Sequence, residues 1–282
     1  GTATPEVSRY YKANVEGWRV LHLPERIAQD KRLPRLASVH VVDMRNELRQ
    51  GNRSIFSYLL QQQLIETLKK GNQSILFLNR RGSAGYVFCR VCGYVMRCPR
   101  CNVPMTAHGK EDILRCHHCN YRKEKPASCP QCGSNAFRQL GIGTETVERE
   151  INRLLPDARV LRWDSDSAQQ SELKDIGLIH FRNRHYDILI GTQMVTKGLD
   201  FPGVSLVGMI LADVGLNLPD FRSSERVFQL LVQVAGRAGR GSTAGDVILQ
   251  TFQPDHKAIE AAANQNYDQF YQWEIEQRRS LA

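Results

Sequence analysis

The chain has 282 residues, which is long for one compact domain and favours two structural units. Hydrophobic residues make up 41% and charged residues 24%, which are ordinary globular values and exclude wholesale disorder. No apolar run reaches the roughly 18 residues of a membrane-spanning helix, and the first residues lack the apolar core of a signal peptide. The net charge of +9 favours a polyanionic partner. Because the sequence begins with Gly1 rather than Met, we expect a segment of a longer protein.

Residues 1–36 differ from the rest of the chain. They contain a helical pattern after Pro5, one short apolar segment from Trp18 to Leu23, and a polar linker with Pro24 and Pro34. Prolines in a polar stretch are typical of a connection between folded units. We therefore predict that this stretch is the tail of a preceding domain, followed by a linker.

Outside a cysteine-rich segment, the remaining chain alternates short apolar runs with helical patterns. This alternation implies crossovers between parallel strands, and nearly continuous apolar runs such as 188–190 suit a sheet that is buried on both faces. We predict an α/β fold with a mainly parallel sheet, whose two parts are residues 37–85 and 137–282. The predicted strands are 38–44, 74–79, 137–143, 158–164, 187–192, 204–211 and 246–251, and the predicted helices are 55–71, 144–156 and 223–237.

All eight cysteines lie between residues 89 and 132, as four Cys-x-x-Cys pairs. Two such pairs complete a tetrahedral Cys₄ zinc site. A disulfide framework needs an oxidising compartment, an iron–sulfur cluster has a tighter run of cysteines, and a redox dithiol uses one pair. We therefore predict two structural zinc ions in an inserted domain over residues 86–136. The residues after the pairs tolerate the left-handed backbone of a tight metal knuckle, and they are Gly93, Asn102, Asn120 and Gly133.

The spacing of the pairs leaves two arrangements open. The two inner pairs are 14 residues apart, close to the range of a zinc ribbon, which favours a nested arrangement. In the sequential alternative, the first two pairs share one ion across a five-residue gap. His117 and His118 could replace a thiolate, but eight cysteines already complete two sites, so we expect exposed histidines. The nested arrangement gives one ion to Cys89, Cys92, Cys129 and Cys132, and the other to Cys98, Cys101, Cys116 and Cys119.

Two weaker signals stand where predicted strands end. Asn79, Arg80 and Arg81 come at the end of the strand 74–79, and Thr144 is a plausible N-cap of the following helix. Exposed amides at a helix N-terminus can bind phosphate. Taken alone, these features equally fit a surface basic pair and an ordinary helix cap.

The loop after the strand 187–192 carries GTQMVTKGLDFP over residues 191–202. Ligands of open α/β sheets bind beyond the carboxyl ends of strands, so this loop is well placed for one. Thr192 and Lys197 could contact a phosphate, and Asp200 a ribose hydroxyl. A polar turn is an equally acceptable interpretation of this loop by itself.

The sequence QVAGRAGR over residues 233–240 follows an amphipathic helix. If the helix continues, Gln233, Arg237 and Arg240 lie on one face at positions i, i+4 and i+7. Two arginines on one stripe can hold a phosphate by bidentate hydrogen bonds. The alternative is a solvated basic helix end, where cations also suit the helix dipole.

A complete nucleotide site is absent from this sequence. It has no GxxxxGK[ST] phosphate-binding loop and no acidic box, and GIGTET over 141–146 fails the last position of GxGxxG. We therefore predict that these residues cannot by themselves cradle the β- and γ-phosphates or hold Mg²⁺.

Together, these motifs resemble a known family. An α/β domain with GTQMVTKGLDFP and then QVAGRAGR resembles the second RecA-like lobe of a superfamily 2 helicase, at motifs V and VI. Four cysteine pairs after ILFLNRRG, followed by GIGTETVE, resemble the PriA family of bacterial primosomal replication-restart helicases. The resemblance covers essentially the whole chain, and GTATP over residues 1–5 is similar to motif III, at the end of lobe 1. It implies that motifs I and II and a DNA-binding domain precede this segment.

The resemblance also implies a role for each candidate residue. ATP binds between two lobes in the family, so Arg237 and Arg240 are the implied arginine fingers and Gln233 couples nucleotide to DNA. Motif V, with Gly198, contacts DNA and transmits the nucleotide state. The family's two zinc ions use the nested pairing. The implied nucleotide contacts are Gly198, Asp200, Arg237 and Arg240, and the implied DNA contacts are Asn79, Arg80, Thr144, Thr192 and Lys197.

The implied function is that of an ATP-dependent 3′–5′ DNA helicase in replication restart and primosome assembly. The implied cofactors are two zinc ions, with ATP and Mg²⁺ in the full-length protein. Its implied partners are single-stranded and forked DNA, other primosome proteins and single-strand-binding protein, in the bacterial cytoplasm at the nucleoid. The alternative is a non-enzymatic zinc-ribbon scaffold that binds nucleic acid or protein. QVAGRAGR distinguishes the two, because a scaffold needs no arginine pair that faces a phosphate.

Overall fold

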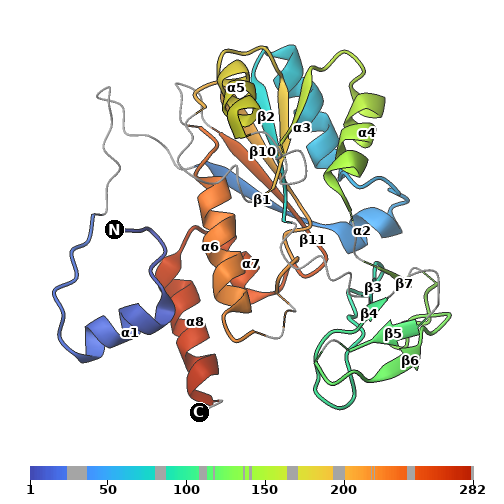
Figure 1. Cartoon of the computed structure of the whole chain (residues 1–282), viewed down its shortest axis with the longest axis vertical. Coiled ribbons are helices and arrows are strands. Elements are labelled where there is room, and N and C mark those ends of the chain that lie inside the picture. Colours follow the sequence, from blue (N-terminus) through green and yellow to red (C-terminus); the bar gives the residue numbers. More distant parts are fainter. Residues whose placement is uncertain are drawn as a thin grey trace.

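A computed structural model of the chain consists of an α/β lobe and a small unit of short strands that is attached beside the end of β11 (Figure 1). Several residues of the sequence motifs lie outside the described parts, namely Arg80, Lys197, Gly198, Asp200 and Arg240. The predictions that concern these five side chains are therefore not addressed by the structure. The structure describes residues 1–23, 37–79, 87–107, 113–116, 118–135, 137–139, 142–163, 171–192, 201–216, 218, 220–239 and 245–280.

The lobe is built on a six-stranded sheet with the order β1-β11-β10-β2-β9-β8. Every neighbouring pair in this sheet is parallel, which confirms the predicted mainly parallel architecture. Six of the seven predicted strand regions supply its strands. They are β1 (Ser38–Asp43), β2 (Gln73–Leu78), β8 (Val160–Trp163), β9 (Ile188–Gly191), β10 (Val204–Ile210) and β11 (Asp246–Thr251).

Both faces of the sheet are buried under helices. Successive side chains of a strand point to opposite faces, so Phe77 of β2 enters one core and Leu76 enters the other. This double burial explains the nearly continuous apolar character of the central strands. One core receives side chains from α2 (Met44–Arg49), α3 (Tyr58–Lys69) and α4 (Thr144–Leu154), and the other from α1 (Val7–Val15), α5 (Ser171–Arg182), α6 (Ser223–Ala235), α7 (Lys257–Ala263) and α8 (Tyr267–Ser280).

Helix α1 packs directly on the lobe. Val7 is fully buried in the core beside α6 and α8, and its N–H donates to Glu225 Oε1 at 2.7 Å. The ring of Tyr10 meets the ring of Tyr267 edge-on, with the centroids 5.4 Å apart. The sequence pattern separates residues 1–36 from the lobe, but these contacts hold the helical part of that segment against it. The domain boundary at residue 36 stays a prediction.

A buried ion-pair cluster fixes the end of α8 against α6. Arg278 Nη2 lies 2.8 Å from Glu225 Oε2 and 2.7 Å from Glu274 Oε1, and the two glutamates are 2% and 4% exposed. We expect Arg278→Ala to lower the free energy of unfolding by about 3–5 kcal/mol, because it leaves buried carboxylates without their cation. Arg279→Ala is the control, since that guanidinium lies over the ring of Tyr11 at the surface and its loss should cost about 1 kcal/mol or less. Denaturant titration compares the two, and equal losses would contradict the prediction.

The cysteine-rich unit is closed at its base by an antiparallel pair of strands. The pairing of β3 (Val87–Cys89) with β7 (Phe137–Gln139) brings together the points where the chain enters and leaves the unit. The prediction that 137–143 forms a strand of the main sheet is therefore wrong, since its first three residues pair with β3 instead. The domain limits of 86 and 136 stay predictions. The unit also holds a three-stranded sheet of β4 (Thr106–Ala107), β5 (Ile113–Arg115) and β6 (Arg122–Glu124).

Candidate metal centres and nucleotide-binding motifs

The eight cysteines form two Cys₄ clusters, and the four sulfur atoms of each cluster lie within 4.8 Å of one another. The shortest sulfur–sulfur distances between the two halves of a cluster are 3.4–3.7 Å. A tetrahedral zinc ion with Zn–S bonds of about 2.3 Å needs sulfurs about 3.8 Å apart, so both clusters fit zinc. The grouping is the nested one and not the sequential one. The close contacts join Cys89 with Cys132 and Cys92 with Cys129 in the first cluster, and Cys98 with Cys119 and Cys101 with Cys116 in the second.

Each cysteine pair lies on the same kind of backbone loop. The N–H of the residue after the pair donates to the carbonyl of the first cysteine, as in Gly93 to Cys89 at 2.8 Å. At this position the backbone φ lies between 55° and 78° in all four loops. Only Gly and Asn adopt that left-handed region at low cost, so the predicted knuckle conformation is confirmed. The four residues are Gly93, Asn102, Asn120 and Gly133.

The electrostatics of the clusters call for a bound cation. The pKa values diverge within each cluster. Burial raises the pKa of Cys92 and of Cys101 to about 12 each, whereas hydrogen bonds from backbone N–H groups lower the pKa of Cys132 and, against the effect of burial, that of Cys98 to about 7. Four sulfurs this close cannot all ionise unless a cation compensates their charge, which Zn²⁺ supplies. All eight cysteines are free of disulfide bonds. Four sulfur donors leave no open coordination position, so the clusters suit structural rather than catalytic zinc.

The helix that precedes the arginine motif stops earlier than the sequence pattern suggests. Helix α6 ends at Ala235, and Gly236 is its C-cap. The predicted helix 223–237 is therefore two residues too long. The condition for placing Gln233 and Arg237 on one helical face is not met, because Arg237 lies in the turn after the helix. In this turn Arg237 is half-buried, while Gln233 on the last turn of the helix is exposed.

The turn after α6 lies at the amino end of the sheet. Gly239 N donates to the carbonyl of Val204, the first residue of β10, at 3.4 Å. Phe201, which follows Asp200 in the sequence, is buried beside the same strand, and its carbonyl accepts from Val204 N at 3.1 Å. The end of the GTQMVTKGLDFP loop and the turn with Arg237 therefore meet at one edge of the sheet.

Two of the predicted DNA contacts lie at the opposite edge. Asn79 follows the carboxyl end of β2, and Thr192 follows that of the neighbouring strand β9. The seven residues of β10 separate the two edges by about 20 Å. Each side chain is only 6% exposed, and Asn79 Nδ2 donates to the carbonyl of Val214. The expectation of surface side chains that track a strand is therefore not met at these two positions.

Thr144 does not cap its helix. Gly143 is the N-cap of α4, with an extended backbone (φ −86°, ψ 162°), and Thr144 is the first helical residue. The prediction of a threonine N-cap is therefore wrong by one position. The Thr144 side chain is fully buried, so it does not present its hydroxyl at the surface where a DNA backbone would pass.

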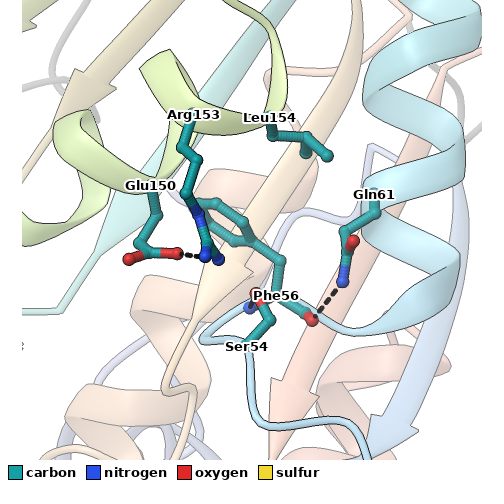
Figure 2. Close-up of a pocket in the computed structure, with 6 residues that line it drawn as sticks. All are labelled: Ser54, Phe56, Gln61, Glu150, Arg153 and Leu154. Carbon is teal, nitrogen blue, oxygen red and sulfur yellow. Dashed lines mark hydrogen bonds and ion pairs between the residues drawn. The ribbon is translucent and has the colours of Figure 1, made fainter.

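A pocket of about 270 Å³ lies between α4 and the segment that leads into α3 (Figure 2). Its polar groups pair with one another. Arg153 Nη2 lies 2.8 Å from Glu150 Oε2, and Gln61 Nε2 donates to the carbonyl of Phe56 at 2.9 Å. Because these donors are already engaged and no sequence motif lies here, the pocket adds nothing to the candidate site.

Sequence reasoning missed one buried acidic residue. Asp213 follows β10 and is only 2% exposed. Burial raises the pKa of its carboxyl group, although donors at the end of β11 surround it. They are the Thr251 hydroxyl and the N–H groups of Phe252 and Gln253. A single Asp after an apolar run does not stand out in the sequence as a buried residue. The groups that donate hydrogen bonds to it come from the end of another strand, which the local sequence does not show.

Comparison with known proteins agrees with this architecture. Residues 98–123 match the PriA DNA helicase Cys-rich region (CRR) domain, and residues 142–242 match the helicase conserved C-terminal domain. Replication restart protein PriA of Bacillus subtilis (strain 168) is 46% identical over 279 residues, which cover 99% of this chain and 34% of that protein. The protein of the same name from Synechocystis sp. (strain ATCC 27184 / PCC 6803 / Kazusa) is 44% identical over 289 residues, with 100% and 34% covered.

The chain thus spans about a third of the length of these relatives. The helicase match covers strands β8, β9 and β10 together with the motifs GTQMVTKGLDFP and QVAGRAGR, and the Cys-rich match covers the second Cys₄ cluster. The likeness extends through the rest of the chain, since the alignments run over nearly all of its residues. The chain is therefore a homologue of the replication restart protein PriA family, and it spans the RecA-like helicase C-terminal lobe and the Cys-rich region of that family.

Proposed function

We propose that this chain is the second RecA-like lobe and zinc unit of an ATP-dependent DNA helicase that acts in replication restart. One observation carries the proposal: the turn with Arg237 lies beside the end of the GTQMVTKGLDFP loop, at the same edge of the parallel sheet. A zinc scaffold without enzymatic activity needs no such juxtaposition. The names of the relatives support the assignment to replication restart.

The amino edge of the sheet would complete an ATP site whose phosphate-binding loop and Mg²⁺ ligands belong to a preceding lobe. A guanidinium donates bidentate hydrogen bonds to phosphate oxygens, so Arg237 and Arg240 would stabilise charge that develops on the γ-phosphate. Gly198 and Asp200 would border the same site. Gln233 is exposed one turn before Arg237 and would couple this site to DNA.

The carboxyl edge of the sheet would face single-stranded or forked DNA. Phosphate contacts give grip without base specificity and weaken as salt rises, which suits a motor that moves 3′ to 5′ along any sequence. The net charge of +9 agrees with a polyanionic partner. Since Asn79, Thr144 and Thr192 are buried, their role here would be to hold the loops that carry Arg80 and Lys197.

Further assignments rest on the relatives alone. Other primosome proteins and single-strand-binding protein are proposed partners, and the bacterial cytoplasm at the nucleoid is the proposed location, because replication restart takes place on DNA. None of the helices in the described part of the chain is long and apolar enough to cross a membrane.

A test of the two-lobe assignment uses the isolated chain. We expect no ATP hydrolysis above background, with or without single-stranded DNA, because the sequence has no phosphate-binding loop and no acidic box. Phosphate release by the highly purified chain is the measurement. The full-length protein is the positive control and should hydrolyse ATP when single-stranded DNA is added. Turnover by the isolated chain would overturn the proposal that a preceding lobe supplies the rest of the site.

A further inference from the structure

The zinc unit contacts the helicase lobe at the end of β11 (Figure 1) and at α2, where Arg49 Nη2 donates to the carbonyl of Val91 at 3.4 Å. Phe88 of β3 meets Phe252 edge-on, with ring centroids 4.8 Å apart. Phe88, Phe252 and Val95 all belong to the core cluster on the α2–α4 face of the lobe. The residues that flank the first metal-binding knuckle therefore belong to the lobe's own core.

Gly93 makes the closest approach at this contact. A Cβ atom at Gly93 would lie 2.9 Å from the carbonyl oxygen of Phe252, a backbone atom that cannot swing aside as a long side chain can. Gly133 holds the equivalent position in the other knuckle of the same Cys₄ cluster. Its φ of 70° matches the 78° of Gly93, but a Cβ atom there would meet nothing within 4 Å. The two glycines share a backbone requirement, and only Gly93 adds a steric one.

Phe252 is in turn held by the buried carboxylate of Asp213. Its oxygens accept from Phe252 N at 3.0 and 3.1 Å, from Gln253 N at 3.1 Å, and from the hydroxyl of Thr251. A shift of this backbone would leave a buried carboxylate with unmade hydrogen bonds, which costs more than an exposed bond would. The carbonyl on which Gly93 rests therefore has a defined position.

The loop that carries Asp213 also contacts the start of the connection to the zinc unit. Asn79, at the end of β2, donates to the carbonyl of Val214, the residue after Asp213. Both the point of departure of the chain and the surface on which the unit rests are thus tied to the same loop after β10.

We propose that the end of β11 is the seat that sets the orientation of the zinc unit on the helicase lobe, with Asp213 as the positioning residue and Gly93 as the contact on the zinc unit. The seat requires neither ATP hydrolysis nor DNA binding. The test therefore measures distances within the chain and not activity. If the proposed helicase function were wrong, the proposal about the orientation of the zinc unit would still stand.

The test compares Gly93→Ala with Gly133→Ala in the zinc-loaded chain. Spin labels at the exposed positions Gln62 of α3 and Lys123 of β6, introduced as non-canonical amino acids, leave the eight cysteines to the metal. We expect the Gly133→Ala variant to keep the wild-type distance distribution by electron–electron double resonance. Gly93→Ala should shift and broaden it, because the knuckle must leave Phe252. Equal distributions for the two variants would overturn the proposal.

A second pair of variants tests Asp213 with zinc content as the companion readout. We expect Asp213→Ala to broaden the same distribution while the chain still holds about two zinc ions, as a pair of Cys₄ sites requires. Asp213→Asn keeps one carbonyl acceptor, so the width of its distance distribution should lie between those of the wild type and Asp213→Ala. The asparagine variant also provides the test if the alanine variant does not fold. Asp220→Ala, nearer to α6, should leave the distances unchanged. Reduced thermal stability with unchanged distances would show that Asp213 is only structural and would overturn its positioning role.

Discussion

Replacement of Arg237 by alanine in the full-length protein should abolish ATP hydrolysis while DNA binding survives. The side chain leaves the turn after α6 at the edge of the sheet where the GTQMVTKGLDFP loop ends, and we assign it to the γ-phosphate. Loss of such an arginine finger typically lowers the rate by about 10³–10⁵-fold, because charge in the transition state is no longer compensated. DNA binding should survive, since the edge of the sheet that we propose to face DNA, with Asn79 and Thr192, is about 20 Å away along β10.

Steady-state phosphate release and fluorescence anisotropy with single-stranded DNA measure the two effects separately. Arg226→Ala is a matched control on the same helix, because that guanidinium pairs with Asp220 at 2.6 Å near the amino end of α6. We expect the control to retain ATPase activity within a few-fold of wild type, as for a surface ion pair. An unchanged turnover number for Arg237→Ala would remove the finger assignment.

Replacement of Cys116 by serine should leave about one zinc ion per chain instead of two and unfold the distal part of the zinc unit. Cys116 is fully buried in a small cluster with Leu114 and Met105, and half of the eight buried residues of this cluster are metal-binding cysteines. A structural zinc site contributes about 10–16 kcal/mol to folding in small zinc domains, far more than so small a core supplies. The helicase lobe should stay folded, because its two cores are built from other residues.

Zinc quantification and hydrogen exchange of residues 97–125 test this expectation. His118→Ala is the control: the side chain is exposed and belongs to neither Cys₄ cluster, so two zinc ions should remain. Retention of two ions by Cys116→Ser would contradict the assignment of that thiolate. If Cys116→Ser also abolished the cooperative unfolding transition of the helicase lobe, the lobe's cores would not be independent of the second zinc site, which would contradict the prediction.

Local patterns carried the sequence predictions that the structure confirms. The six strands of the main sheet appear as apolar runs in the sequence. Helices cover both faces of the sheet, so consecutive residues of a strand are buried and are therefore apolar. The metal knuckles are equally local: two cysteines and one left-handed Gly or Asn within five residues define each loop. Such features need no knowledge of distant parts of the chain.

The errors arose where a distant segment decides the structure. Residues 137–139 form a strand, but their partner is β3 in the zinc unit and not the main sheet. The helical periodicity up to residue 237 does not show that α6 stops at Ala235, where the backbone turns back to meet β10. The polar side chain of Asn79 was expected at the surface, but its amide points inward and donates to the carbonyl of Val214.

The sequence by itself determined the α/β class, the eight zinc-ligand candidates, and the presence of helicase motifs without a phosphate-binding loop. Periodicity and cysteine spacing are properties of neighbouring residues, so they can be seen without coordinates. Only the tertiary structure decided that the arginine turn lies at the opposite edge of the sheet from Asn79 and Thr192. It likewise decided that Asp213 and Gly93 meet at Phe252. These contacts join residues that are 39 and 159 positions apart in the chain, and a local sequence pattern does not show such pairings.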